Sequence, residues 1–244
     1  MERYRTRLTS VEVEELKPKA GEFHIGRCEA IRSLEFLPRL EIETSLVLHL
    51  IPLVMLKKDT NYLKDPELIT YIMNFTRGFK GYRYNREGIL IYDAGYPSGV
   101  AKSYFQFFRN GIFEFYTSEI FDERKPKYIR AELIERLCIE VVERSQKQLL
   151  DKLGIIPPLV VCASLYGLRD KAILPPERFE QPEVNRFDID SLTVLSVLLK
   201  DYDADIPKAF RDGFDVMWQS SGWSQSPFYD ASGDWSGRGK KKPL

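Results

Sequence analysis

Ser103-Tyr-Phe-Gln-Phe-Phe-Arg-Asn-Gly-Ile-Phe-Glu-Phe-Tyr-Thr117 is the stretch that says most about the fold. Asn110-Gly111 separates two aromatic-rich runs, and this dipeptide tolerates the two positive φ angles of a type I′ hairpin turn. The stretch predicts a β-hairpin whose two-residue turn pairs Phe108 with Phe113 and Phe107 with Glu114. This register places aromatic rings on both faces of the hairpin, so at least one face must be covered by a helix, another sheet or a partner.

Further short apolar runs on either side of the hairpin predict buried strands. They are Ser45–Leu53, Gly88–Asp93, Leu159–Leu165 and Leu192–Leu199. The first of them contains His49, which we expect to be a core histidine. Several short strands with a tight hairpin among them indicate a mostly antiparallel sheet.

Two segments have the spacing of helices. One runs from Pro126 to about Leu153, where aliphatic residues recur at steps of three to four before Gly154. The other follows Asp205, an N-cap residue with a proline in the first turn after it, and carries aromatic residues on one side as far as Trp218. The predicted fold class is α+β: a mostly antiparallel sheet with an Asn-Gly hairpin, covered by a long central helix and a C-terminal helix.

The chain divides into three parts by composition. Residues 1–44 are charged and weakly periodic, and predict a leader with a short helix over Ile25–Leu37 that Pro38 ends, with Pro18 and Gly21 as breaks before it. Residues 45–235 are expected to form a single α+β domain. Residues 236–244 predict a basic, flexible tail.

The bulk composition excludes some classes of protein. The 244 residues hold 36 Lys and Arg and 36 Asp and Glu, so no whole-molecule field attracts nucleic acid or membrane, and any nucleic-acid binding needs a local patch. The 3 cysteines lie far apart in sequence, which is typical of reduced thiols. No apolar run approaches the length of a membrane span. We therefore expect a cytoplasmic protein that neither enters a membrane nor forms disulfides.

No catalytic or metal-binding constellation is visible in the sequence. Neither His24 nor His49 lies near another histidine, and no two cysteines have the spacing of a zinc site. Asp201-Tyr-Asp203-Ala-Asp205 resembles the start of a calcium loop but lacks its glycine and glutamate, and a strand end with a helix cap explains it better. Ser164 and Cys162 lie in a predicted strand with only two histidines to activate them. The sequence predicts a non-enzymatic chain without a cofactor.

One stretch has the composition of a nucleic-acid contact. It alternates cations that can bind phosphates with tyrosines that can stack on bases: Lys80, Tyr82, Arg83, Tyr84 and Arg86. The alternative, which we favour on composition, is a solvated loop whose aromatic residues anchor it to the core. The terminal groups Arg3, Arg5 and Arg7, and Lys240–Lys242, are less specific.

Other aromatic residues are candidates for contact with a protein partner, because aromatic residues dominate binding hot spots. They are Phe105 and Phe107 of the hairpin, with Trp223 and Trp235 near the C-terminus. The alternative is that these rings belong to the core.

Several segments in order resemble one known family. They are Arg27–Arg32, Leu46–Leu53, Gly81–Leu90, Ser103–Glu114, Val161–Gly167, Phe214–Gly222 and Ser226–Asp230. Together they resemble the region that follows the AlbA-like domain in bacterial Schlafen-type proteins, which are often labelled DNA-binding or ATP-binding. The resemblance spans about residues 25–235, and only about 25 residues of this sequence precede it, so we expect a chain without the AlbA-like domain. No residue role of that family can therefore be carried over.

The resemblance implies an accessory role. A module that elsewhere lies beside a nucleic-acid-directed domain is expected here to act in trans, docking a partner protein that supplies the missing activity, in phage defence or transcriptional regulation. The leading hypothesis is a non-catalytic binding module of this kind. The alternative hypothesis is direct binding of nucleic acid through the basic and aromatic stretch.

Overall fold

The fold is dominated by one large sheet, as predicted for an α+β protein. The computed structural model describes residues 8–33, 39–41, 43–57, 60–76, 79, 81–94, 100–122, 125–173 and 185–237. An 8-stranded sheet has the strand order β11-β9-β2-β6-β5-β4-β3, with β1 paired to β5, and a 3-stranded sheet has the order β10-β8-β7. Neighbouring strands along the large sheet are antiparallel, whereas β1 with β5 and β10 with β8 are parallel.

The strands follow the apolar runs of the sequence closely. The large sheet is made of β1 (Arg39–Leu40), β2 (Ser45–Pro52), β3 (Gly81–Tyr84), β4 (Gly88–Ala94), β5 (Val100–Phe108), β6 (Phe113–Thr117), β9 (Leu159–Tyr166) and β11 (Ser191–Leu199). The small sheet is made of β7 (Phe121–Asp122), β8 (Lys125–Ile129) and β10 (Ala172–Ile173). Short 3₁₀ segments, η1 (Leu53–Leu56) and η2 (Tyr62–Lys64), follow β2, and the π-helical turn η3 (Gln146–Leu150) follows α3.

The predicted hairpin exists, but its predicted register is wrong. Phe107 pairs with Phe113, and Gln106 pairs with Glu114. The loop has three residues, because the Phe108 N–H donates to the carbonyl of Ile112 (2.9 Å) and Gly111 adopts a left-handed φ of 84°. A shift of one residue exchanges the two faces of a strand, and the observed register brings Phe107 and Phe113 to one face and the polar pair to the other.

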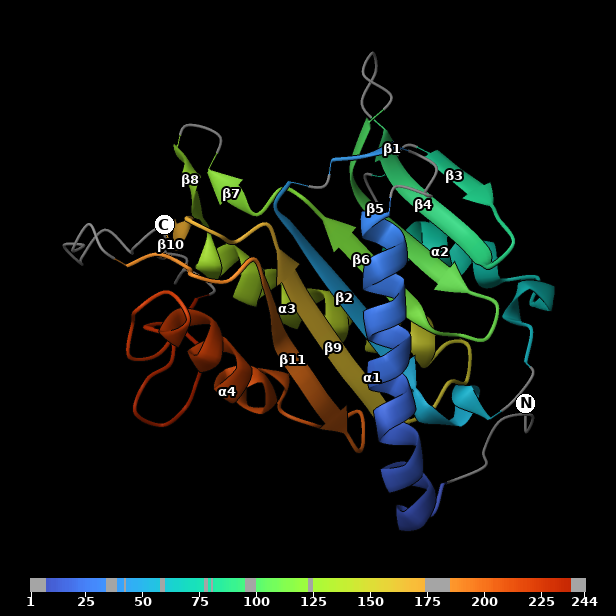
Figure 1. The fold of residues 1–244 in the computed structure, drawn as a ribbon. Coiled ribbons are helices and arrows are strands. Elements are labelled where there is room, and N and C mark those ends of the chain that lie inside the picture. The colour runs from blue at the N-terminus through green and yellow to red at the C-terminus, as the bar shows by residue number, and fades with distance from the viewer. Residues whose placement is uncertain are drawn as a thin grey trace, which may run out of the picture.

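Helices cover both faces of the large sheet (Figure 1). On one face lie α2 (Leu68–Phe75), α3 (Ala131–Ser145) and α4 (Ile206–Gln219), over the main hydrophobic core that contains Phe105, Phe113 and Trp218. On the other face lies α1 (Ser10–Arg32), which crosses the middle of the sheet. The leader predicted for residues 1–44 thus contributes a helix that shares its core with the sheet.

The first helix is much longer than the predicted Ile25–Leu37 segment. It starts after Thr9, which forms a capping box with Glu12, and continues through Pro18 and Gly21 to Arg32. Sequence reasoning treated Pro18 as a break. The proline is tolerated within a helix that buries Leu16, Ala20, His24, Cys28 and Ile31 against the sheet.

The central helix starts later than predicted. Pro126 lies in strand β8, and α3 begins at Ala131, so the proline does not start the helix. Gly154, with a φ of 66°, lies beyond the π-helical turn, as expected for a glycine after a helix.

The C-terminal helix and the segment after it pack as one unit. Asp205 caps α4 by accepting a hydrogen bond from the Lys208 N–H (3.1 Å), as predicted. Ser236, placed in the predicted tail, donates its N–H to the carbonyl of Phe228 (2.7 Å), whereas residues 238–244 lie outside the described part of the chain.

Candidate nucleic-acid interface

The basic and aromatic stretch forms an edge strand of the large sheet. Sequence reasoning favoured a solvated loop here, but Gly81–Tyr84 is strand β3, which pairs with β4 at the end of the strand order. Tyr82, Arg83 and Tyr84 are all exposed, the two tyrosines to 51% and 56%. This stretch therefore projects side chains from both faces of the sheet margin. Lys80 lies outside the described residues.

The two tyrosines share a face and Arg83 occupies the other. Tyr82 pairs with Ile91 and Tyr84 with Ile89, two residues of the main core, so both rings project on the side of the sheet where that core lies. Arg83 pairs with Leu90, which packs on the α1 side. Two exposed rings at alternate strand positions provide adjacent surfaces on which unpaired bases can stack.

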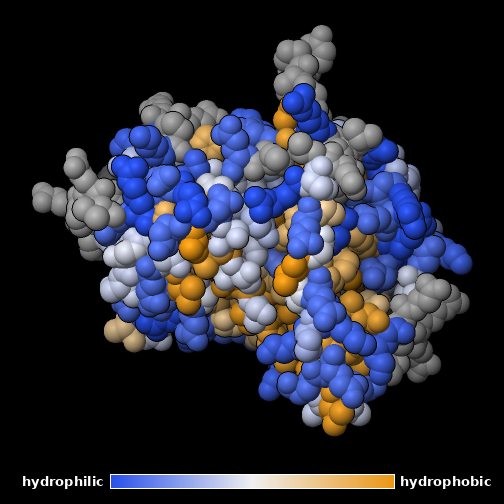
Figure 2. Space-filling view, viewed as in Figure 1, coloured by the Kyte–Doolittle hydropathy of each residue, from blue (hydrophilic) through white to orange (hydrophobic). Residues whose placement is uncertain are grey.

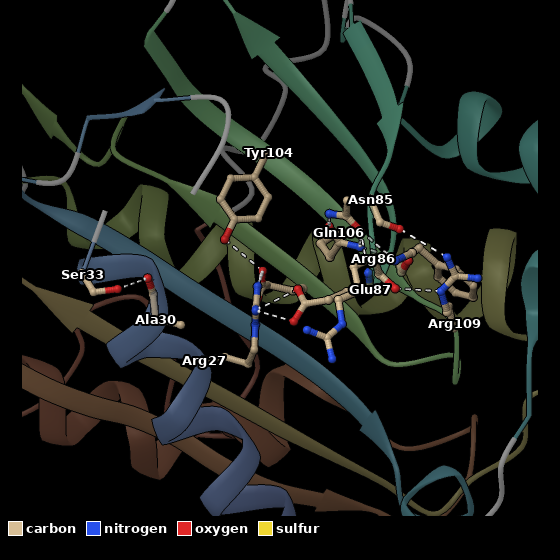
Figure 3. Close-up of polar contacts among 12 residues, drawn as sticks. Arg27, Ala30, Ser33, Asn85, Arg86, Glu87, Tyr104, Gln106 and Arg109 are labelled. Atoms are coloured by element: carbon tan, nitrogen blue, oxygen red, sulfur yellow. Dashed lines mark hydrogen bonds and ion pairs between the residues drawn. The ribbon is translucent and has the colours of Figure 1, made fainter. Parts of the chain in front are cut away.

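Two further cations meet at the neighbouring turns. Arg86 lies in the turn between β3 and β4, and Arg109 in the hairpin loop between β5 and β6. The Arg109 guanidinium donates to the backbone carbonyls of Arg86 (2.8 Å) and Asn85 (3.3 Å), as Figure 3 shows. Sequence reasoning missed Arg109, because only the tertiary structure brings the two turns together.

We call Tyr82, Arg83, Tyr84, Arg86 and Arg109 the edge patch. Within the described ranges, no carboxylate forms an ion pair with any of its three arginines. The sheet margin at β3 is also mainly hydrophilic on the visible face (Figure 2). This surface chemistry suits a charged ligand better than an apolar protein surface.

Asn85 holds the turn of the edge patch in place. Its side-chain oxygen accepts the N–H groups of Glu87 (3.0 Å) and Gly88 (2.7 Å), and its amide donates to Gln106 (2.7 Å). Gly88 allows the close approach of the two hairpins, since a Cβ at this position would lie 1.9 Å from the carbonyl oxygen of Phe107.

An ion-pair network, buried at Glu114 and exposed at Glu87, connects this turn to α1. Arg27 donates to Glu87 (2.9 Å) in the turn and to both oxygens of Glu114 (2.9 and 3.0 Å) on β6, and Tyr104 also donates to Glu114 (2.9 Å). Figure 3 shows the Arg27 side chain reaching from α1 toward these groups. Burial would raise the pKa of Glu114, but the hydrogen bond from His49 and the charge of Arg27 lower it to about 2.

The residues predicted to contact a protein partner lie elsewhere. Phe105 and Phe107 are 7% and 1% exposed and pack in the main core, so they are not available to a partner; their alternative interpretation as core residues agrees with the structure. Trp223 is partly buried with its ring 5.6 Å from that of Trp218. Trp235 is also partly buried and donates its indole N–H to Glu135 (2.7 Å).

The structure also places the groups considered for metals and membranes. Asp201 accepts the Asp203 N–H (3.1 Å) and Asp205 caps α4, so local backbone contacts account for both. Within the part of the chain that the structure describes, no group of three or more His, Cys, Asp or Glu residues could hold a metal ion. No helix in the same ranges is long and apolar enough to cross a membrane.

Comparisons with protein-family models, curated proteins and solved structures find no match for this chain. The class of this protein is therefore described by its fold and its candidate site. It is an α+β protein with a mostly antiparallel sheet, and the β3 edge of that sheet carries exposed tyrosines and arginines.

Proposed function

We propose that this chain is a binding module for single-stranded nucleic acid, and that the edge patch is its contact surface. The observation that carries the proposal is the exposure of Tyr82, Arg83 and Tyr84 together on one edge strand. Large aromatic side chains are normally buried when they serve only the fold. Two exposed tyrosines beside cations are the usual components of a sequence-tolerant single-strand site.

Each part of the edge patch has a defined task. The rings of Tyr82 and Tyr84 stack on successive bases, and stacking is worth about 1–3 kcal/mol per base. Arg83, Arg86 and Arg109 bind the phosphates of the same strand. Because the formal net charge of the chain is +0, attraction depends on this local patch, and binding should be moderate in strength and strongly reduced by salt.

Two observations favour this function over docking to a protein partner through the hairpin. The phenylalanines that would form that docking surface are buried, whereas the proposed nucleic-acid contacts that the structure describes are exposed. The ligand is expected to be a single strand, because stacking on Tyr82 and Tyr84 requires unpaired bases.

The test is fluorescence anisotropy with labelled single-stranded DNA and RNA of mixed sequence, alongside the matching duplex. We expect the single strands to bind, and the variant carrying Tyr82→Ala and Tyr84→Ala to bind at least about 30-fold more weakly, since each of the two rings supplies about 1 kcal/mol or more. Val216→Ala, at another exposed apolar position (43% exposed), is the matched control and should bind like the natural chain.

Charge reversal separates the phosphate contacts from stacking. Arg83→Glu should weaken binding and reduce the slope of log affinity against log salt, whereas Lys200→Glu, the same charge change at an exposed residue just after β11, should leave both nearly unchanged. Affinity that is equal for all variants, or a preference for the duplex, would overturn the proposal.

A further inference from the structure

A chain of buried hydrogen bonds links three strands to α1, separate from the edge patch. The Ser164 hydroxyl on β9 lies 2.8 Å from His24 Nε2, His24 Nδ1 lies 2.7 Å from His49 Nδ1 on β2, and His49 Nε2 lies 2.7 Å from Glu114 on β6. We call these four residues the Ser164 relay. Sequence reasoning found no partner for either histidine, and the structure corrects this: helix and sheet bring the two rings into contact.

Hydrogen-bond chemistry gives the relay a direction. Burial lowers the pKa of His24 to about 3, so this ring is neutral near pH 7. Glu114 can only accept from His49 Nε2, because its carboxyl is ionised. In the arrangement that needs no charged ring, His49 Nδ1 accepts from His24 Nδ1. His24 Nε2 is then left as an acceptor, and the Ser164 O–H donates to it.

This arrangement has the parts of an activated nucleophile: a hydroxyl, a base within hydrogen-bond distance, and a carboxylate that orients the base, here through a second imidazole. The neighbouring thiols are poor candidates, since burial raises the pKa of both Cys28 and Cys162 to about 12. We propose that Ser164 is a nucleophile that accepts an acyl group from a carboxylic ester, with His24 as its base and His49 and Glu114 as positioning residues.

Access to Ser164 is from the β11 side of α1. Ser164 is 2% exposed, but its hydroxyl lies 3.1 Å from that of Thr193, its partner on β11, and Thr193 is exposed. Figure 1 shows that, within the described ranges, no helix crosses β11 and the adjoining part of β9 on the α1 face. The exposed Thr193 side chain therefore lies in direct contact with the proposed nucleophile.

The reaction conserves atoms and protons. Ser164 Oγ forms a bond to the carbonyl carbon of the ester while its proton passes to His24 Nε2. The bond from that carbon to the alcohol oxygen then breaks, and the alcohol leaves with the proton from His24. Water attacks the resulting serine ester, His24 takes a proton from the water and returns it to Ser164 Oγ, and a carboxylic acid is released.

The test is covalent labelling of the whole chain with a fluorophosphonate, which loses fluoride as it phosphonylates an activated serine, followed by peptide mass spectrometry. We expect the label at Ser164, none in Ser164→Ala, and normal labelling in Ser196→Ala, which removes an exposed serine of β11. His24→Gln should slow labelling, because it removes the side chain that accepts the Ser164 proton.

Two further measurements separate a nucleophile from a purely structural network. Thr193→Ala shortens the exposed side chain that contacts Ser164, so it should label faster than the natural chain. His49→Gln should shift the pH profile of labelling, which a lost structural contact alone would not do. The proposal is overturned if neither the natural chain nor Thr193→Ala is labelled at Ser164 while circular dichroism shows both folded. Equal labelling rates in His24→Gln and the natural chain would overturn it as well.

Discussion

At the scale of single residues, two buried carboxylates are stabilised in opposite ways. Glu114 has a cationic partner in Arg27, and its pKa is lowered to about 2. Glu135 on α3 has neutral donors: the indoles of Trp218 (2.8 Å) and Trp235 (2.7 Å) and the hydroxyl of Ser226 (2.7 Å). Burial raises the pKa of Glu135 to about 7, although these hydrogen bonds oppose the shift.

The raised pKa of Glu135 predicts a specific dependence of stability on pH. A carboxyl whose pKa is higher in the folded chain stabilises the fold fully below its ordinary value of 4.5 and loses this contribution as pH rises through about 7. The loss should be about 3 kcal/mol. The Glu135→Gln variant has no carboxyl to ionise and should not show this loss. Between pH 4.5 and about 7, the unfolding free energy of the natural chain should therefore fall by about 3 kcal/mol relative to that of the variant. Urea unfolding at several pH values in this range measures the difference.

A control on the same helix isolates the effect. Glu132 is exposed in the first turn of α3, so Glu132→Gln should keep the pH dependence of the natural chain. If Glu135→Gln and the natural chain have parallel stability curves from pH 4.5 to 7, the carboxylate does not titrate as expected.

At the scale of elements, the first helix depends on its cap and on a narrow buried stripe. The Thr9 hydroxyl accepts from the Glu12 N–H (3.3 Å), and the Thr9 N–H donates to the Glu12 carboxylate (2.8 Å). The buried face of α1 is made of leucine, alanine, histidine, cysteine and isoleucine. Because few of these residues are strongly hydrophobic, the helical periodicity of hydrophobic residues is weak in this segment. For this reason sequence reasoning found only a short helix near its end.

The cap can be tested directly. Thr9→Ala removes the hydroxyl acceptor of the capping box, and we expect a loss of about 1 kcal/mol in unfolding free energy. Hydrogen exchange should accelerate most in the first turn of α1. Ser10→Ala changes a neighbouring exposed residue that is not the cap, and an equal loss there would show that Thr9 contributes nothing special.

At the scale of the whole molecule, polar side chains form a continuous path between α1 and the sheet. It starts at the exposed Thr193, passes through the Ser164 relay to Arg27, and ends at Glu87 beside the edge patch. Arg27 is the cation on which this path depends, because Glu114 lies fully buried beside it. The path fixes the position of α1 on the sheet by directional bonds as well as apolar packing.

Removing that cation should weaken the whole fold. Arg27→Met leaves the buried Glu114 without its ion pair, and we expect a loss of about 3–5 kcal/mol in unfolding free energy, measured by urea unfolding. Arg32→Met removes an exposed pair with Asp190 from the same helix and should cost about 1 kcal/mol or less. Similar losses in the two variants would contradict the central place of Arg27.

Local chemistry alone predicted much of this protein. The apolar runs identified β2, β4, β9 and β11, Asn110-Gly111 identified the hairpin, and Asp205 identified the start of α4, because strand patterning, turn residues and helix caps act between near neighbours in the chain. The same reasoning singled out the composition of the edge patch, except for Arg109. The resemblance to the Schlafen-type region stays a prediction.

Tertiary structure decided what depends on distant contacts. Packing of the phenylalanines against one core set the hairpin register, and the sheet covered by α1 joined His24 to His49 across 25 positions of sequence. The exposure of Tyr82 and Tyr84 follows from the place of β3 at the sheet edge, which no local pattern specifies. The sequence by itself determined where most strands and helices form, because the signals for them are local. Which strand or helix packs against which depends on the surfaces that the folded chain buries together.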